Sequence, residues 1–320
     1  CFIKYYMQTI SQRIYKSIQS ALAKTAKTVW WLLKIILPVS LFVAFLQYWG
    51  VIAFMATYLE PVFSVIGLPG ESAIVFITSL FLPLYAPLSI IATLPLDIRD
   101  ITILAIMCLI SHNLFVESAV QRKTGSSGVV LFFLRIFISF VAAFVFNKLL
   151  PQDMGHTVDM ETSQVFTNIP DMLLAWLQSA GWLTLKIVVI VGGLMILQNL
   201  LKEFQLLHYI SRAFAPFMQI MGLSRDSSFL WFVAQTLGLT YGSVVMIDAV
   251  ENNEISARNA DLLNYHIAVN HSLLEDTLLF VAIGVPAGWI IFPRILLAIV
   301  VVWSVRLVYA RIAKSAFPAS

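Results

Sequence analysis

Long apolar stretches alternate with short polar segments along almost the whole chain. The stretches run at about 28–49, 73–94, 101–120, 128–149, 179–201, 228–249, 262–283 and 288–310. Each has roughly the 20 residues that a helix needs to cross the hydrocarbon layer of a bilayer. The pattern predicts an all-α fold, a polytopic membrane helix bundle with the lipid bilayer as its partner.

Two shorter apolar segments, 51–68 and 206–223, leave the number of spans open. Glu60-Pro61 interrupts the first segment, and Arg212 and Pro216 interrupt the second. If both segments cross the membrane the chain has ten spans, and if neither crosses it has eight. Short spans, re-entrant segments and interfacial helices are all compatible with such interrupted sequences.

The composition and charge agree with a membrane protein and exclude several other classes. Hydrophobic residues make up 60% of the chain and charged residues 12%, against roughly a quarter charged in soluble domains. Lys and Arg lie mostly at the ends of apolar stretches rather than in a basic stripe, so no nucleic-acid partner is expected. No phosphate loop, nucleophile elbow or zinc-protease motif is present, and the two cysteines, Cys1 and Cys108, lie far apart. The sequence therefore predicts neither an enzyme nor a cofactor.

The chain contains an internal duplication. Gly67–Ser72 recurs as Gly222–Ser227, Tyr85 matches Tyr241, and Ser111–Ser118 matches Asn270–Thr277, in the same order and with nearly the same spacing. We therefore predict two membrane repeats, 28–150 and 178–311. The other predicted parts are a basic amphipathic helix over 1–27, a polar acidic linker over 151–177 and a tail over 312–320.

The distribution of basic residues predicts how the repeats are oriented. With ten spans and the N-terminus inside, most Lys and Arg lie on the inner side, and only Arg99, Lys148 and Arg225 lie outside with the acidic linker. The positive-inside rule favours this arrangement over eight spans. Five spans in each half make the second repeat inverted relative to the first, with both termini cytoplasmic.

Each repeat carries a His-containing polar cluster inside an apolar stretch. An ionisable group at the centre of a membrane costs at least about 2.5–3.5 kcal/mol, so it marks a functional site by default. We expect the clusters near the middle of two helical spans, meeting at the interface between the halves. The candidate residues for substrate binding or proton coupling are His112, Asn113, Glu117 and Ser118, and Asn270, His271, Ser272, Glu275, Asp276 and Thr277.

Five further residues are candidates for lining the site. Tyr85 lies between Pro83 and Pro87, and Tyr241 between Gly238 and Gly242, so both stretches are predicted to be broken helices. The remaining candidates are Asn264 and His266, which make the second half richer in polar groups, and Ser227, which follows an acidic residue at a predicted helix start. The competing interpretations are residues at the membrane edge, kinks that serve helix packing, and plain helix capping.

At these residues the chain resembles the bacterial gate-domain, or "nucleoside recognition", family. The resemblance rests on Gly67–Ser72, on Ser111-His112-Asn113 with Glu117, on Gln121–Gly125 and on Asn270–Thr277. It implies a bacterial inner-membrane protein, and the family label implies a nucleoside-like ligand. Related gate domains form the membrane part of ferrous-iron transporters and occur in sporulation membrane proteins. Iron-transporter gates carry a Cys in their broken span, and this sequence has none near Tyr85 or Tyr241.

The leading functional hypothesis is a transporter that moves a small polar solute through a site between the two repeats, with proton coupling at His and carboxylate groups. The first alternative is a divalent metal ion transporter whose ligands are His112, Glu117, His271 and Asp276, because His and carboxylates suit zinc, manganese or iron. The second alternative is a membrane scaffold or sensor that transports nothing, in which the clusters only hold the halves together. A homo-oligomer is compatible with each hypothesis.

Overall fold

The computed structural model describes residues 9–154 and 168–316. Every regular element in these ranges is a helix, which agrees with the predicted all-α class. Five helices among the described residues are long and apolar enough to cross a membrane, namely Ile10–Tyr48, Ile98–Lys123, Gly128–Leu149, Ile169–Glu203 and Ala287–Ile312. The architecture is therefore that of a membrane helix bundle.

The two halves contain the same elements in the same order. The first half consists of α2 (Ile10–Tyr48), α3 (Val51–Phe63) with the 3-10 turn η1 (Ser64–Ile66), α4 (Ser72–Phe81), α5 (Tyr85–Ile91), α6 (Ile98–Ser111), α7 (Leu114–Lys123) and α8 (Gly128–Leu149). The second half consists of α9 (Ile169–Glu203), α10 (Leu206–Ile220) with η2 (Arg225–Ser227), α11 (Ser228–Leu237), α12 (Leu239–Glu251), α13 (Ala257–Val269), α14 (Leu273–Val281) and α15 (Ala287–Ala316). Neighbouring pairs also recur, since α8 packs on α6 and α7 as α15 packs on α13 and α14.

The helices differ in extent from the predicted segments. The basic N-terminal segment continues without a break into the first apolar stretch, because no Gly or Pro interrupts residues 10–37. Residues 1–8 of the predicted amphipathic helix lie outside the described residues. α9 begins at Ile169, within the predicted linker, where Asn168 accepts a hydrogen bond from the backbone N–H of Asp171 at 2.9 Å. α15 ends at Ala316, within the predicted tail.

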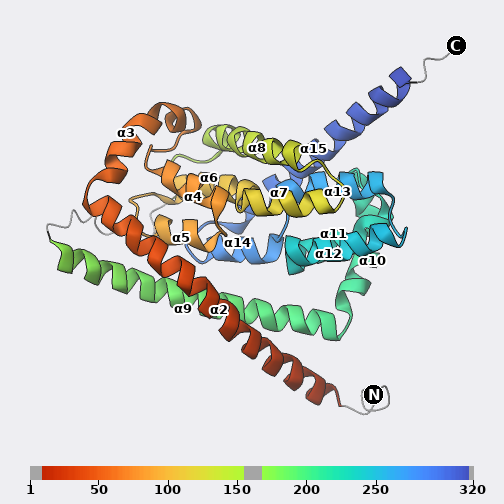
Figure 1. Cartoon of the computed structure of the whole chain (residues 1–320), viewed down its shortest axis with the longest axis horizontal. Coiled ribbons are helices and arrows are strands. Elements are labelled where there is room, and N and C mark those ends of the chain that lie inside the picture. The colour runs from red at the N-terminus through yellow and green to blue at the C-terminus, as the bar shows by residue number, and fades with distance from the viewer. Residues whose placement is uncertain (1–8, 155–167, 317–320) are drawn as a thin grey trace.

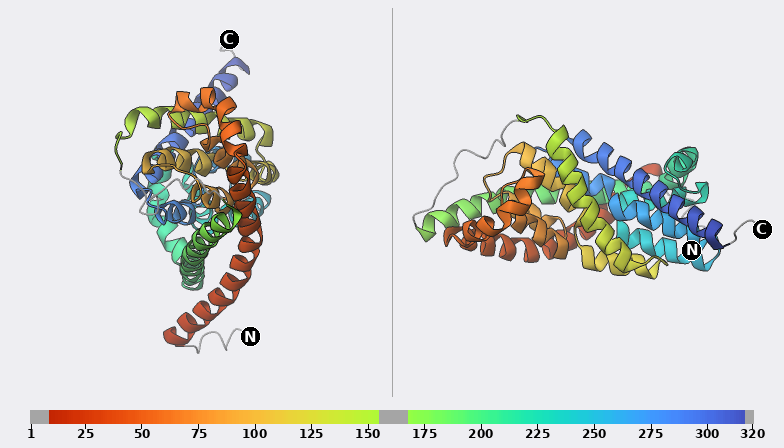
Figure 2. Two further views of the ribbon diagram at one scale, coloured as in Figure 1. Left: turned by 90° about the vertical axis from the view of Figure 1, so that its left-hand side faces the viewer. Right: turned by 90° about the horizontal axis from the view of Figure 1, so that it is seen from above.

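Matched helices of the two halves run in opposite directions. In Figure 1, α2 runs from the N-terminal end of the molecule to the left-hand end, and α9 runs back beside it. α6 and α7 follow one another from left to right, whereas α13 and α14 follow one another from right to left. Figure 2 shows α2 extending beyond the bundle at its N-terminal end. Both described chain ends therefore lie at the same end of the molecule.

Two of the predicted spans turn back instead of crossing the molecule. α4 has 10 residues and packs against α5 in a hairpin, and α11 and α12 form the matching hairpin. A helix needs roughly 20 residues to cross a bilayer, and the 13 residues of α3 and 15 of α10 are also too few. None of these segments is among the five helices of the described residues that are long and apolar enough to cross a membrane. The chain reverses at Leu82–Leu84 and at Gly238, whose φ of 82° suits glycine.

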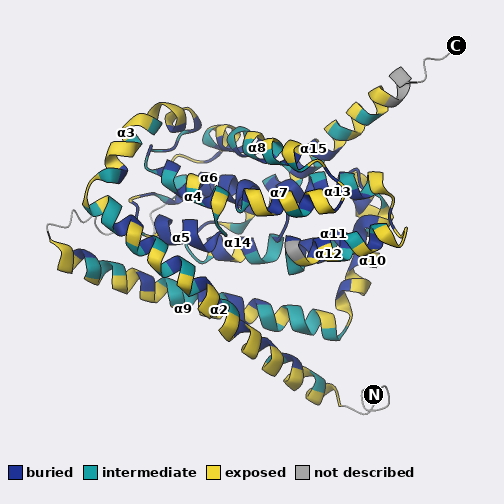
Figure 3. Cartoon of the chain, in the orientation of Figure 1, coloured by how far each residue is buried: buried dark blue, intermediate teal, exposed yellow. Residues whose placement is uncertain are grey.

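The most buried part of the chain lies where the repeats meet. Nearly all of α6 is buried, and the residues from Ile103 to Ile110 have no solvent exposure. Most residues from Ala260 to Val269 in α13 are buried as well. Figure 3 shows this buried centre surrounded by partly exposed faces of α2, α8 and α9. Large apolar side chains such as Trp30, Phe133 and Trp182 are exposed on those outer faces, as expected for surfaces that contact lipid.

Candidate functional site

Two interrupted helices bring the predicted clusters to the buried centre. α6 ends at Ser111, and Asn113 takes a left-handed backbone conformation with φ of 48° before α7 begins. The second half repeats the geometry at Ser272, with φ of 47°, between α13 and α14. His112 and His271 are therefore at breaks, which corrects the expectation that they lie inside continuous helical spans. Neither break contains the Gly or Pro that would have marked it in the sequence.

The tips of the two hairpins hold these breaks in place. The backbone N–H of Asn113 donates to the carbonyl oxygen of Ser79 in α4 at 2.7 Å, and the N–H of Ser272 donates to that of Ala234 in α11 at 3.1 Å. Gln235 adds a side-chain hydrogen bond to the carbonyl of Asn270 at 2.6 Å. A tertiary hydrogen bond thus satisfies a backbone group that the helix break leaves without an intrahelical partner.

The four ionisable residues singled out in the sequence lie together. The ring centroids of His112 and His271 are 5.0 Å apart. Glu117 lies between them, with one carboxylate oxygen 3.3 Å from Nε2 of His112 and the other 3.3 Å from Nε2 of His271. Asp276 Oδ2 is 3.9 Å from Nε2 of His112. Each of the four residues is less than a tenth exposed.

The backbone determines which imidazole nitrogen carries a proton. Nδ1 of His112 is 3.0 Å from the carbonyl oxygen of Cys108, and Nδ1 of His271 is 2.8 Å from that of Ile267. A carbonyl oxygen only accepts hydrogen bonds, so Nδ1 is the donor in both rings. Both Nε2 atoms consequently face the Glu117 carboxylate, either as bare lone pairs or as the second N–H of a charged imidazolium.

Two buried arginines complete the cluster, and the analysis of the sequence missed both. Arg135 in α8 pairs with Glu117 at 2.7 Å and donates to the carbonyl oxygens of Ile110 and His112 at 2.7 and 2.8 Å. Arg294 in α15 donates to the carbonyl of His271 at 2.5 Å. The signal was present, because the separation between Arg135 and Arg294 is the same as that between His112 and His271. Extending the repeat alignment past the acidic positions would have found them.

The two halves of the cluster are not equivalent. With neutral imidazoles, the charges of Glu117 and Asp276 balance those of Arg135 and Arg294. Arg135 pairs with Glu117, but among the described residues no pair within 4.0 Å joins Arg294 to Asp276, consistent with an aspartate side chain one carbon shorter. Several buried polar atoms here have no hydrogen-bond partner in the described parts of the chain, namely Nε and Nη1 of Arg294, both side-chain polar atoms of Asn270, Thr277 Oγ1 and Ser118 Oγ. Arg135 Nη1 and Gln121 Oε1 in the first half are also without a partner in the described residues, so both halves offer donors and acceptors to a ligand.

Tyr85 and Tyr241, which the sequence match pairs, have different surroundings. The hydroxyl of Tyr85, at the tip of the first hairpin, donates to Glu275 at 2.7 Å and so links the two halves. Tyr241 is 46% exposed, and the Lys202 ammonium lies 4.1 Å from the centroid of its ring. The sequence match between the tyrosines thus does not extend to their surroundings.

The remaining candidates make other contacts. Asn264 is buried in a polar network and donates to the hydroxyls of Thr124 and Ser126, each at 2.8 Å. Ser126 in turn donates to Asp261 at 2.5 Å. Nδ1 of His266 accepts from the indole of Trp231 at 3.2 Å. The bonds of Asn264 and Asp261 join α13 to the turn between α7 and α8, and the bond of His266 joins α13 to α11. Ser227 lies in η2, with its hydroxyl 2.7 Å from that of Ser224.

Three of the clustered residues have the arrangement of metal ligands. One ligand atom each from His112, Glu117 and His271 lies within 4.8 Å of the others. Metal-binding imidazoles usually donate the other ring N–H to a carbonyl or carboxylate, as both rings do here. The ion pair with Arg135 competes for the same carboxylate. The donor set fits a divalent cation if one carboxylate, Glu117, contacts both the cation and the guanidinium of Arg135.

Comparison with known proteins agrees with this architecture. The sequence model of the Gate family, described as nucleoside recognition, matches residues 29–125. A Bacillus subtilis (strain 168) protein described as the uncharacterized membrane protein YvoD is 33% identical over 294 residues, which cover 91% of this chain and 94% of the relative. No solved structure matches the chain significantly. The chain is therefore a membrane protein that belongs to the gate, or nucleoside recognition, family.

Proposed function

We propose that the protein is a transporter that moves a small polar solute, such as a nucleoside-like molecule, across the inner membrane of a bacterium, with protons carried by His112 and His271. The observation that carries the proposal is the convergence of both Nε2 atoms on the Glu117 carboxylate at 3.3 Å, in the buried centre of the bundle. Buried ionisable groups at this depth are characteristic of substrate and proton pathways.

The course of the chain supports an inverted repeat around this site. In each half, a long helix, an interrupted helix and another long helix run along the long axis of the molecule, and a short helix and a hairpin complete the half. Three passes per half make the second half inverted, since matched helices run in opposite directions. Transporters with inverted repeats place their sites at interrupted helices between the repeats. Our proposal thus replaces the ten predicted spans with six spans and two re-entrant hairpins.

The charges at one end of the molecule support the orientation. α2 begins with Arg13, Lys16 and Lys24, and α7 ends with Arg122 and Lys123. In Figure 1, the start of α2 and the end of α7 lie toward the end of the molecule that holds both described chain ends. The positive-inside rule places this end in the cytoplasm. Both termini are then cytoplasmic, as the sequence predicted.

Hydrogen bonding at the centre of the cluster depends on a proton or a cation. If both Nε2 atoms and the Glu117 carboxylate were unprotonated, the lone pairs of the rings would face the carboxylate oxygens, which is repulsive. A proton on either ring or on Glu117, or a cation between these groups, removes the repulsion. We propose that this proton is the one that moves with the solute.

Reconstituted protein tests the proposal. Full-length protein in liposomes containing the pH dye pyranine should acidify or alkalinise the lumen when a panel of uridine, adenosine and guanosine is added outside. His271→Gln should abolish the signal because it removes a protonatable nitrogen from the centre. His208→Gln, at an exposed position in α10, is the matched control. Equal flux in His271→Gln and wild type would remove the cluster from the pathway, and no flux with any solute would favour a scaffold or sensor.

A divalent cation is the second candidate cargo, supported by the three converging ligand atoms. A cation and protons compete for the same Nε2 atoms, so binding should weaken as the pH falls. Zn²⁺ or Mn²⁺ added to the purified protein should raise its melting temperature at pH 7.5 and have less effect at pH 5.5. The double variant His112→Gln with His271→Gln should lose the response. A wild-type melting temperature unchanged by either metal at both pH values would reject the cation.

A further inference from the structure

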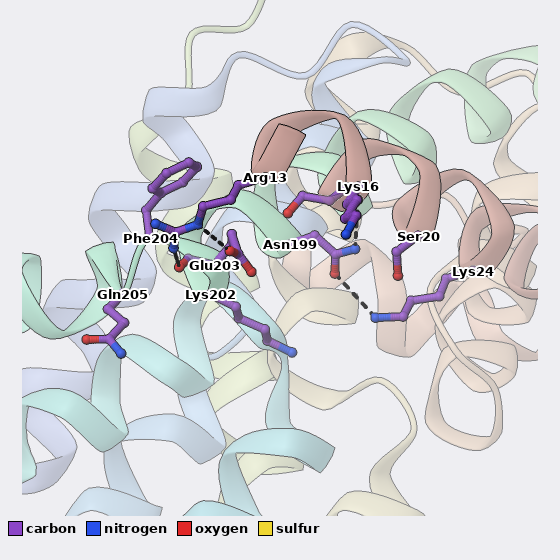
Figure 4. Close-up of a pocket in the computed structure, with 10 residues that line it drawn as sticks. Arg13, Lys16, Ser20, Lys24, Asn199, Lys202, Glu203, Phe204 and Gln205 are labelled. Atoms are coloured by element: carbon purple, nitrogen blue, oxygen red, sulfur yellow. Dashed lines mark hydrogen bonds and ion pairs between the residues drawn. The ribbon is translucent and has the colours of Figure 1, made fainter. Parts of the chain in front are cut away.

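A second polar feature lies far from the His cluster, between the N-terminal part of α2 and the end of α9. It is a cavity of about 580 Å³ that opens to the surface. Basic side chains dominate its lining, with Arg13, Lys16 and Lys24 from α2 and Lys202 from α9. Figure 4 shows the side chains of Lys24 and Lys202 extending toward the same space from the two helices. The transport proposal does not use this cavity.

The basic residues lie on one face of α2. Arg13, Lys16, Ser20 and Lys24 follow the three- and four-residue spacing that places side chains on the same side of a helix. Ile14, Tyr15 and Leu22 lie on other faces and are exposed. A helix with one basic and one apolar face is typical of segments in the headgroup layer of a membrane. The 39 residues of α2 span about 58 Å at 1.5 Å per residue, well beyond the roughly 30 Å of hydrocarbon.

Only one of the four cations has a carboxylate partner. Arg13 pairs with Glu203 at 2.7 Å and donates to the backbone carbonyl of Glu203 at 2.9 Å. Lys24 bonds only to the neutral side-chain oxygen of Asn199, at 3.4 Å. Among residues 9–154 and 168–316, no carboxylate oxygen lies within 4.0 Å of the ammonium groups of Lys16, Lys24 or Lys202. The eight residues before Thr9 contain no Asp or Glu.

We propose that this cavity binds a phosphate-bearing anion, of which the headgroup of an anionic membrane lipid is the first source and a free phosphate compound the second. Three ammonium groups around one space repel one another, and a phosphate group accepts from all three at once. The hydroxyl of Ser20 and the amide of Asn199 line the same space and add neutral hydrogen-bond partners. The position at the basic end of the molecule, beside the amphipathic part of α2, matches the depth of lipid headgroups.

Lipid retention by the full chain tests the proposal. The protein is purified in mild detergent, incubated with equal amounts of phosphatidylglycerol and phosphatidylcholine, and examined by native mass spectrometry. Separate samples receive inorganic phosphate alone, and the melting temperature is followed by tryptophan fluorescence. The test variant is Lys16→Gln with Lys24→Gln and Lys202→Gln. The control, Lys27→Gln with Arg122→Gln and Lys123→Gln, removes the same charge from exposed positions that do not line the cavity.

Wild type and control should retain phosphatidylglycerol over phosphatidylcholine, and the test variant should bind it about tenfold or more weakly, as expected for the loss of three lysines. Raising the salt concentration should reduce the difference. Stabilisation by inorganic phosphate that only the test variant loses would identify a soluble phosphate compound as the ligand. Equal retention of both lipids by all three proteins, with no response to phosphate, would overturn the proposal. Equal losses in test and control variants would also overturn it.

Discussion

Replacing Arg135 by Met should destabilise the protein far more than the same change at Arg294, although the repeat places the two arginines at equivalent positions. Arg135 holds the buried Glu117 carboxylate at 2.7 Å and two backbone carbonyls at the helix break. Arg294 holds one carbonyl, at 2.5 Å, and in the described chain has no carboxylate within 4.0 Å. The consequences of losing the two cations therefore differ in kind.

The magnitudes follow from these contacts. Removing one partner of a buried ion pair costs about 3–5 kcal/mol, because the other charge stays buried without its partner. Leaving one buried carbonyl without a donor costs about 1–3 kcal/mol. Because Arg135 also holds two carbonyls, we expect Arg135→Met to lower the free energy of unfolding by at least about 2 kcal/mol more than Arg294→Met. Adding Glu117→Gln to Arg135→Met should restore part of the loss, since it removes the unpaired charge.

Unfolding in mixed micelles measures these differences. The purified variants are titrated with sodium dodecyl sulfate, and the loss of structure is followed by tryptophan fluorescence and circular dichroism. Arg294→Met is the matched control for position and chemistry. Equal losses in the two single variants would refute the assignment of the ion pair, and so would a double variant no more stable than Arg135→Met.

Three other substitutions test separate contacts by the same unfolding titration. Tyr85→Phe should cost about 0.6–1.7 kcal/mol, the range for hydrogen bonds between membrane helices, because it loses the bond to Glu275; a cost no greater than that of Tyr241→Phe would contradict this. Asn264→Leu should cost about 1–3 kcal/mol, since the hydroxyls of Thr124 and Ser126 lose a buried partner, and unchanged stability would show that the network contributes nothing. Gly70→Ala should cost about 1–3 kcal/mol, because its Cβ would lie 2.3 Å from the carbonyl oxygen of Ala56. Gly181→Ala should instead be neutral or stabilising by about 0.5–1 kcal/mol, because nothing lies within 4 Å of the new Cβ. Equal effects at the two glycines would argue against the close approach of Gly70 to α3.

The sequence by itself determined the membrane class, the duplication and the identity of the central acids and histidines. Apolar stretches of helical length are local signals, because the bilayer requires each crossing segment to satisfy its own backbone. The match of Ser111–Ser118 with Asn270–Thr277 is likewise visible without coordinates. The prediction that these clusters would meet follows from the duplication alone, and the structure places His112 and His271 with ring centroids 5.0 Å apart.

The fold of two predicted spans was decided by tertiary structure. The stretches 73–94 and 228–249 have the length and hydropathy of spans, yet each folds into a hairpin. Pro83 and Gly238 showed that these helices break, but a broken helix can continue across the membrane or reverse. The reversed hairpins accept hydrogen bonds, at the carbonyls of Ser79 and Ala234, from the backbone N–H groups of Asn113 and Ser272, which are remote in sequence.

The breaks at the histidines are likewise accompanied by contacts from distant parts of the chain. Asn113 and Ser272 adopt left-handed conformations, and no neighbouring Gly or Pro in the sequence indicates them. Buried arginines from α8 and α15 bind the carbonyls released at these breaks. The repeat predicted which residues are equivalent, but Arg135 pairs with Glu117 at 2.7 Å, whereas Arg294 forms no such pair among the described residues. Spacing along the chain carries no such information, because an ion pair depends on distances of a few ångströms between segments that only packing brings together.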